Sequence, residues 1–83
     1  MRVEYKEKAI DQLVQLSPAL RKRITDKIDF YASQSDPLSF AKHLAGYNAY
    51  RFRVGDYRVI IESKADTLFV LLIVRRDGAY RDL

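Results

Sequence analysis

Five arginines between positions 51 and 76 are the residues of this chain best suited to chemistry. They lie within or directly after alternating apolar segments, at Arg51, Arg53, Arg58, Arg75 and Arg76. Each guanidinium keeps its charge at neutral pH and offers a planar fork of donors that matches the geometry of phosphate. Because successive side chains of a strand point to opposite faces, Arg51 and Arg53 share one face. The sequence therefore predicts a phosphate clamp held on a rigid sheet.

Structural roles for these arginines remain open at this point. Arg58 could form an ion pair with Glu62, which lies four residues further along the same strand face. Arg51 and Arg53 could instead mark an exposed strand edge that discourages aggregation.

Length and composition restrict the function classes. The 83 residues (1–83) fit one domain, and a hydrophobic share of 48% fits a packed core. There is no cysteine, only one histidine and no close carboxylate cluster, so we expect no metal site and no cofactor. The longest strongly apolar run, Leu68 to Val74, is too short to span a membrane, and the charged N-terminus lacks a signal-peptide core. A cytoplasmic location is expected. The net charge of +4 is too modest to identify a nucleic-acid binder by itself.

Apolar periodicity predicts the elements that must position the arginines. Two helices are expected, at 6–16 and 18–33, with Ser17 capping the second one. Strands are expected at 1–5, 49–54, 57–62 and 67–74, with a short strand or turn around Leu44. Short turns at Gly55-Asp56 and Ala65-Asp66 imply that the last three strands are antiparallel neighbours.

This order predicts a compact α+β domain. An N-terminal strand and a two-helix hairpin would pack on an antiparallel β-meander. Helices that cover one face of the sheet leave its other face, or its edge, to carry the arginines. The last strand is apolar on both faces, which is typical of a strand inside a sheet.

Three motifs carry a resemblance to a known family. They are Leu44-Ala45-Gly46, the block from Tyr50 to Ile60 (YRFRVGDYRVI), and the late Arg76 with Tyr80-Arg81. Together with the order of the elements, they closely resemble the RelE-type toxins of bacterial and archaeal toxin–antitoxin pairs, within the RelE/ParE-type superfamily. The resemblance covers nearly the whole chain.

The resemblance implies a function. RelE-type toxins are metal-independent endoribonucleases that cleave mRNA in the ribosomal A site, by attack of a ribose 2′-hydroxyl on the adjacent phosphate, and so inhibit translation. It also implies the partners: a cognate antitoxin protein, the ribosome and mRNA, with no membrane and with DNA only through the antitoxin complex.

The same resemblance implies roles for individual residues. Arg51 and Arg53 match the paired basic residues of the family, Arg58 would bind the scissile phosphate, and Arg76 matches the arginine that closes the last strand. Tyr80 matches the C-terminal tyrosine that contacts or orients base and ribose. Further RNA-binding candidates are the basic run Arg21, Lys22 and Arg23, together with Lys42, Arg75 and Arg81. The run is also a plausible solvated helix face.

The general base is not identified by the sequence. Many relatives carry a histidine near the end of the last strand, where this chain reads Ile73-Val74-Arg75-Arg76. An arginine holds its proton too firmly to act as a good base. His43 and Glu62 are candidates, although surface and structural roles suit them equally. Two other functions therefore stay open: a ParE-like toxin that poisons DNA gyrase by binding, and an inactive relative that binds only RNA or an antitoxin.

Overall fold

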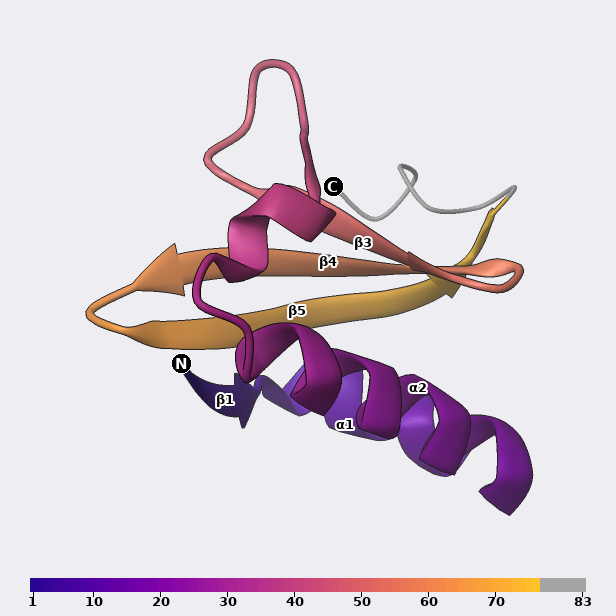
Figure 1. The fold of residues 1–83 in the computed structure, drawn as a ribbon. Coiled ribbons are helices and arrows are strands. Elements are labelled where there is room, and N and C mark those ends of the chain that lie inside the picture. Colours follow the sequence, from indigo (N-terminus) through magenta and orange to yellow (C-terminus); the bar gives the residue numbers. More distant parts are fainter. Residues whose placement is uncertain (77–83) are drawn as a thin grey trace.

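A computed structural model describes residues 1–76 and has the predicted α+β class, with two helices packed on a five-stranded mixed sheet (Figure 1). The elements are β1 (Arg2–Tyr5), α1 (Glu7–Val14), α2 (Pro18–Ala32), the 3₁₀ segment η1 (Pro37–Phe40), β2 (Lys42–His43), β3 (Tyr50–Val54), β4 (Tyr57–Lys64) and β5 (Thr67–Arg75).

The sheet contains the expected antiparallel meander. Its strand order is β1-β5-β4-β3-β2, and β3, β4 and β5 are antiparallel neighbours. The N-terminal strand extends the meander, since β1 pairs in parallel with β5. The last strand therefore lies between β1 and β4, which explains why it is apolar on both faces.

Both predicted turns of the meander are confirmed, and both use left-handed backbone. Gly55 has φ 58°, which its missing Cβ permits. Ala65 and Asp66 have φ of 51° and 62°, so two non-glycine residues form the β4–β5 turn. The left-handed region costs an L-residue roughly 1–2 kcal/mol, so this second turn is strained.

The helical hairpin is confirmed with a shorter first helix. The side-chain oxygen of Ser17 accepts a hydrogen bond from the Leu20 amide at 3.3 Å, which is the predicted cap of α2. The first helix ends at Val14 instead of residue 16. Beyond that point Arg21 donates to the carbonyls of Leu13 and Leu16, both at 3.0 Å, and satisfies the open end of α1.

The short strand or turn expected around Leu44 is confirmed, because a short strand ends at His43 and the Tyr47 amide donates to the Leu44 carbonyl at 3.1 Å in the turn that follows. The short strand is β2, at Lys42–His43, and Leu44 follows it. A 3₁₀ turn that starts at Pro37 precedes it, outside the two helices that the apolar periodicity predicts. A strand of two residues is too short to give an alternating pattern, so its exact bounds could not be read from the sequence.

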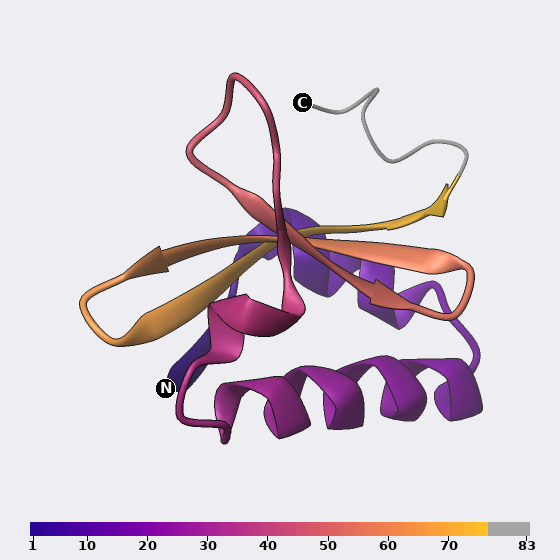
Figure 2. The same ribbon diagram turned by 45° about the horizontal axis from the view of Figure 1, so that its top comes forward.

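The two faces of the sheet differ. α1 and α2 lie together on one face (Figure 2), where Ala9, Ile24 and Ile28 are fully buried in the main core with Phe52 and Val59. We call the opposite face the outer face. A smaller apolar cluster lies there, formed by Leu44, Ala49, Ile60 and Leu72. The outer face is therefore partly apolar and firmly packed.

A register shift between β4 and β5 adds an apolar residue to that second cluster. Ile60 lies opposite Leu72 and Ile61 opposite Val70, so Leu71 is an extra residue in β5. Leu71 and Leu72 consequently both pack with the outer-face cluster. Of the helices in residues 1–76, none is long and apolar enough to cross a membrane.

Candidate active site

Two arginines face each other across neighbouring strands of the outer face. Arg53 of β3 and Arg58 of β4 are directly opposite partners, and side chains at such positions are roughly 5 Å apart at Cβ. Like charges in that arrangement destabilise a sheet. Arg58 is only 8% exposed, next to apolar residues of the outer face, whereas Arg53 is exposed. A buried cation beside a second cation is an arrangement that an anion would stabilise.

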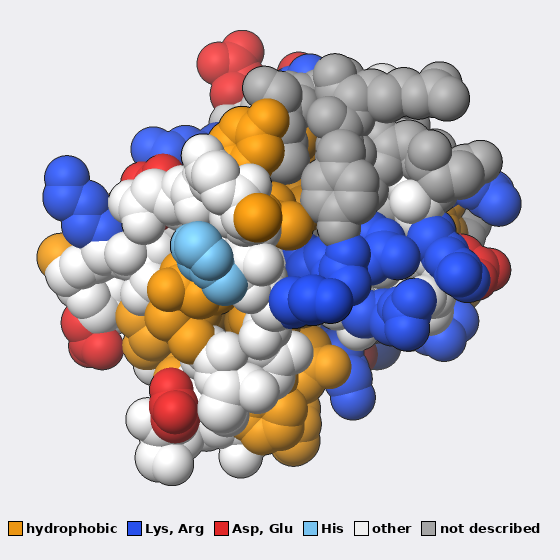
Figure 3. All heavy atoms as spheres, turned by 90° about the horizontal axis from the view of Figure 1, so that it is seen from above, with side chains coloured by type: hydrophobic (Ala, Val, Ile, Leu, Met, Phe, Trp, Pro, Cys, Tyr) orange, Lys and Arg blue, Asp and Glu red, His pale blue; other side chains and the backbone are white. Residues whose placement is uncertain are grey.

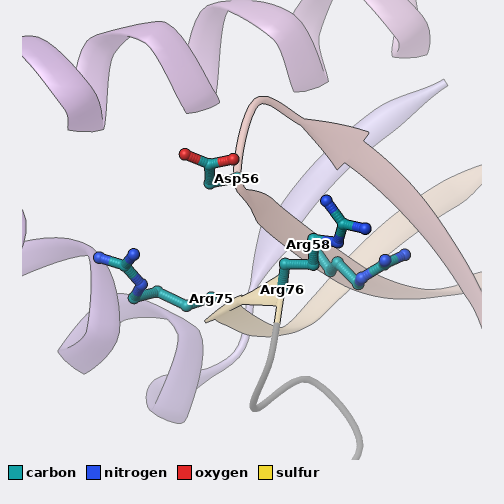
Figure 4. A pocket seen from close by; sticks show the side chains of 4 residues that line it. All are labelled: Asp56, Arg58, Arg75 and Arg76. Carbon is teal, nitrogen blue, oxygen red and sulfur yellow. The ribbon is translucent and has the colours of Figure 1, made fainter.

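Arg58 lines a cavity that we call the arginine pocket. It has a volume of about 390 Å³ and is lined by Asp56, Arg58, Arg75 and Arg76. The side chains of Arg58 and Arg76 extend to the same side in the close-up, while Arg75 points the other way (Figure 4). This division follows the strand alternation: Arg75 pairs with Tyr57, a residue of the helix-facing core. Arg58 and Arg76 are therefore the pair that can grip one anion.

Two hydrogen bonds fix the end of β5, where Arg76 lies. The backbone amide of Arg76 donates to the Asp56 carbonyl at 2.8 Å, which ties the strand end to the β3–β4 turn. The amide of Ile73 donates to the Gln12 side-chain oxygen of α1 at 2.7 Å. β1 pairs with β5 only as far as Val70, so Gln12 supplies the acceptor that the missing strand cannot.

Arg51 belongs to a second cavity, which we call the loop pocket. This cavity of about 390 Å³ is lined by Lys42, His43, Leu44, Ala45, Tyr47 and Arg51. Lys42 and Arg51 are cross-strand partners of β2 and β3. The structure thus separates the predicted basic pair: Arg53 stands beside Arg58, and Arg51 stands with Lys42 and His43.

The basic run of α2 has mainly structural contacts. Arg21 binds the end of α1, as described above. Lys22 donates to Asp26 at 2.8 Å, and this hydrogen bond raises the pKa of the Lys22 amine. The guanidinium of Arg23 lies against the β3–β4 turn, where a Cβ on Gly55 would come within 3.0 Å of it. Their RNA-binding role stays a prediction.

Cationic side chains gather over one side of the outer face (Figure 3). The register explains the clustering, because Arg53 and Arg58 form one cross-strand row and Lys42 and Arg51 form the next. Tyr80 and Arg81 lie outside the described residues, so their predicted roles remain predictions.

Neither candidate base lines the arginine pocket. His43 lies in the loop pocket, with its ring edge-on to Tyr50 at a centroid distance of 5.1 Å. Glu62 lies opposite Phe69, further along β4. The one carboxylate among residues 1–76 that lines the arginine pocket is Asp56, and it points away from Arg58 (Figure 4).

Three residues with a place in these sites were missed by the sequence analysis. Asp56 was assigned only to a turn, although its position two residues before Arg58 was a usable signal. Tyr47 is an exposed aromatic in a loop and so has no packing explanation. No pattern in the sequence indicated the role of Gln12, because its partner Ile73 lies far away in the chain. Among residues 1–76, no group of histidine, cysteine and carboxylate side chains could hold a metal ion.

The arrangement can bind a phosphodiester and stabilise extra charge on it. Two guanidiniums from adjacent strands line the pocket: burial restricts Arg58, so its donors need little reorganisation, whereas Arg76 is exposed at the strand end. This is what a phosphoryl-transfer transition state requires of a site that uses side chains alone.

Comparison with solved structures finds RelE toxins from several species. The RelB–RelE complex from Methanococcus jannaschii is 27% identical, with a TM-score of 0.69, and the match covers 95% of this chain and 96% of that one. The RelE–RelB complex from Pyrococcus horikoshii is 28% identical, with a TM-score of 0.70 and coverage of 90% and 93%. The isolated Escherichia coli RelE toxin shares the fold at 15% identity, with a TM-score of 0.74 and coverage of 99% and 98%. No protein-family model and no curated protein sequence matches the chain.

Proposed function

From the confirmed resemblance of this chain to RelE-type toxins, we propose that it is the toxin of a type II toxin–antitoxin pair. Its activity is metal-independent endoribonucleolytic cleavage of mRNA in the ribosomal A site, which inhibits translation in the cytoplasm. Its partners are a cognate antitoxin, the ribosome and mRNA. Two of the similar structures, from M. jannaschii and P. horikoshii, are complexes of RelE with RelB, which supports the antitoxin as a partner.

The observation that carries the enzymatic part is the placement of Arg58. It is 8% exposed, stands opposite Arg53 and lines a pocket with Arg76. Arg58, Arg75 and Arg76 bring three positive charges to the lining of one pocket, and Asp56 brings a single carboxylate. The grouping favours a site for a phosphate that gains negative charge during reaction.

In the proposed reaction a ribose 2′-oxygen attacks the adjacent phosphorus, and the bond from phosphorus to the 5′-oxygen breaks. The products are a cyclic phosphate on one fragment and a 5′-hydroxyl on the other. Arg58 and Arg76 bind the non-bridging oxygens, Arg53 adds positive potential, and Tyr80 orients base and ribose. The proton of the 2′-hydroxyl leaves to a base, and the departing 5′-oxygen takes up one proton from an acid; the structure assigns neither group.

Metabolic labelling after induction of the chain tests this proposal against the gyrase alternative. Early loss of methionine incorporation, with mRNA 5′-hydroxyl ends mapping to A-site codons, is expected. Early loss of thymidine incorporation with intact mRNA would instead support a ParE-like gyrase poison. An unchanged rate of both would leave only a binding function.

A further inference from the structure

The loop pocket lies on the outer face beside the proposed cleavage site and has no part in the reaction above. It is formed by the end of β2, the following loop and β3. Leu44, one of its walls, is buried in the outer-face cluster with Ile60 and Leu72. The pocket is therefore anchored to the sheet that carries the arginines.

The walls of this pocket are already held in place. The amide of Leu44 donates to the Ala49 carbonyl at 3.0 Å, and the amide of Tyr47 donates to the Leu44 carbonyl at 3.1 Å. Gly46 turns the chain between them with φ +82°, a conformation that favours glycine. A preformed pocket binds a ligand without the entropy cost of ordering a loop.

The lining residues combine rings with cations. Tyr47 is 49% exposed and His43 is exposed, so both rings can be reached by a ligand, while Leu44 and Ala45 add apolar surface. Lys42 and Arg51 place positive charge on the same cavity. A flat aromatic ligand that carries a phosphate matches this combination, and a nucleotide of single-stranded RNA is such a ligand.

Arg51 connects the two pockets. It lines the loop pocket and lies two residues from Arg53 on the same face of β3, a distance of roughly 7 Å along a strand. Arg53 in turn stands opposite Arg58. A row of cations thus leads from the arginine pocket to the loop pocket, as a nucleic-acid backbone would require.

We propose that the loop pocket is a nucleobase subsite, occupied by a nucleotide that flanks the one whose phosphate lies in the arginine pocket. This inference rests on the proposed function, since it takes RNA as the substrate. Tyr47 stacks on the base, and Lys42 and Arg51 contact the phosphate attached to that nucleotide. The subsite supplies binding and register, and the chemistry stays at Arg58.

Binding of a fluorescent, fully 2′-O-methylated octaribonucleotide to the purified chain tests the proposal, because this probe lacks the nucleophile and cannot be cleaved. Stacking on one aromatic ring contributes enough that Tyr47→Ala should weaken binding roughly fivefold to a hundredfold. Tyr47→Phe should bind like the parent protein. Phe30→Ala is the matched control: Phe30 is also 49% exposed but lies on α2, which covers the other face, so its loss should not change the dissociation constant.

Abasic substitution at each position of the probe completes the test. One position should lose affinity in the parent protein but not in Tyr47→Ala, which would pair that base with that ring. The subsite would be overturned if, at every probe position, the affinity losses from abasic substitution and from Tyr47→Ala were additive. Equal binding of the unmodified probe by Tyr47→Ala and the parent would also overturn it. The subsite would also be overturned if Tyr47→Ala weakened binding of a protein partner, such as the antitoxin, and left binding of the RNA probe unchanged.

The two proposals fail separately. If mRNA cleavage is absent while the coupling between Tyr47 and one base is present, the ribonuclease function is wrong and the subsite stands. If cleavage is present without that coupling, the function stands and the subsite is wrong.

Discussion

Replacing Arg58 by methionine should abolish most cleavage while leaving the fold intact. Methionine keeps the length and flexibility of the side chain among the apolar neighbours of the outer face, and only the charge and the donors are lost. Loss of a preorganised donor in a water-poor site typically costs about 10²–10³-fold in rate, which is about 2.7–4 kcal/mol of transition-state stabilisation. Arg58 is 8% exposed, so we expect a loss in this range.

Arg53, the exposed cross-strand partner of Arg58, provides the matched control for the loss of cleavage rate. At 4 Å two unit charges interact by about 1 kcal/mol in bulk water and more strongly as water is excluded, and Arg53 is exposed, so its charge acts close to the water limit. Arg53→Met should therefore reduce the rate only about fivefold, since its charge is largely solvated.

Single-turnover cleavage of mRNA on programmed ribosomes measures both rates, and thermal unfolding followed by circular dichroism measures stability. Ile60→Ala is the reference for structural damage, because Ile60 is fully buried and its truncation should cost about 2–5 kcal/mol. The reasoning is refuted if Arg58→Met unfolds as early as Ile60→Ala, or if Arg53→Met loses as much activity as Arg58→Met.

Three further predictions concern the scaffold. Gln12→Ala leaves the buried Ile73 amide without its acceptor and should cost about 1–3 kcal/mol, whereas Gln12→Glu keeps an acceptor oxygen; denaturant unfolding of the two variants should differ accordingly. Ala65→Asn combined with Asp66→Gly relieves two left-handed non-glycine residues and should stabilise by about 1–2 kcal/mol; an unchanged or lower melting temperature would show that the turn is not strained. Burial raises the pKa of Tyr5 from 10.0 to about 12, so the folded state keeps the proton that the unfolded state releases, and stability should fall as the pH rises from about 10 to 12. Tyr5→Phe should remove that part of the slope, and a parallel decline in the variant would contradict it.

The sequence predicted the fold because its patterns are local. Alternation in 49–54 and 57–62, the Ser17 cap and the short turns each follow from neighbouring residues, and the antiparallel order follows from the turns. The parallel pairing of β1 with β5 joins segments more than sixty residues apart and left no local signal. The bounds of the short strand β2 likewise depend on its pairing with β3 and could not be read from local residues.

The candidate site was predicted in part for the same reason. Strand alternation placed Arg51 and Arg53 on one face and separated Arg75 from Arg76, and the geometry agrees. The burial of Arg58 depends on a neighbouring strand and could not be read from the residues around it. The contacts of Arg21 with the end of α1 likewise depend on how the helical hairpin closes, so they could not be read from the residues around it.

The ratio of two single-turnover rates tests the central claim most directly: cleavage of an mRNA on programmed ribosomes against cleavage of the same RNA free in solution. Neither His43 nor Glu62 lines the arginine pocket, so the proposed function predicts that the ribosome must align the 2′-oxygen, phosphorus and leaving oxygen. Alignment of this kind contributes a large part of a rate enhancement, and we expect the ribosomal rate to be at least about a hundredfold higher. Comparable rates on both substrates, abolished by His43→Ala, would contradict the account, because the protein would then carry its own complete acid–base set in the loop pocket.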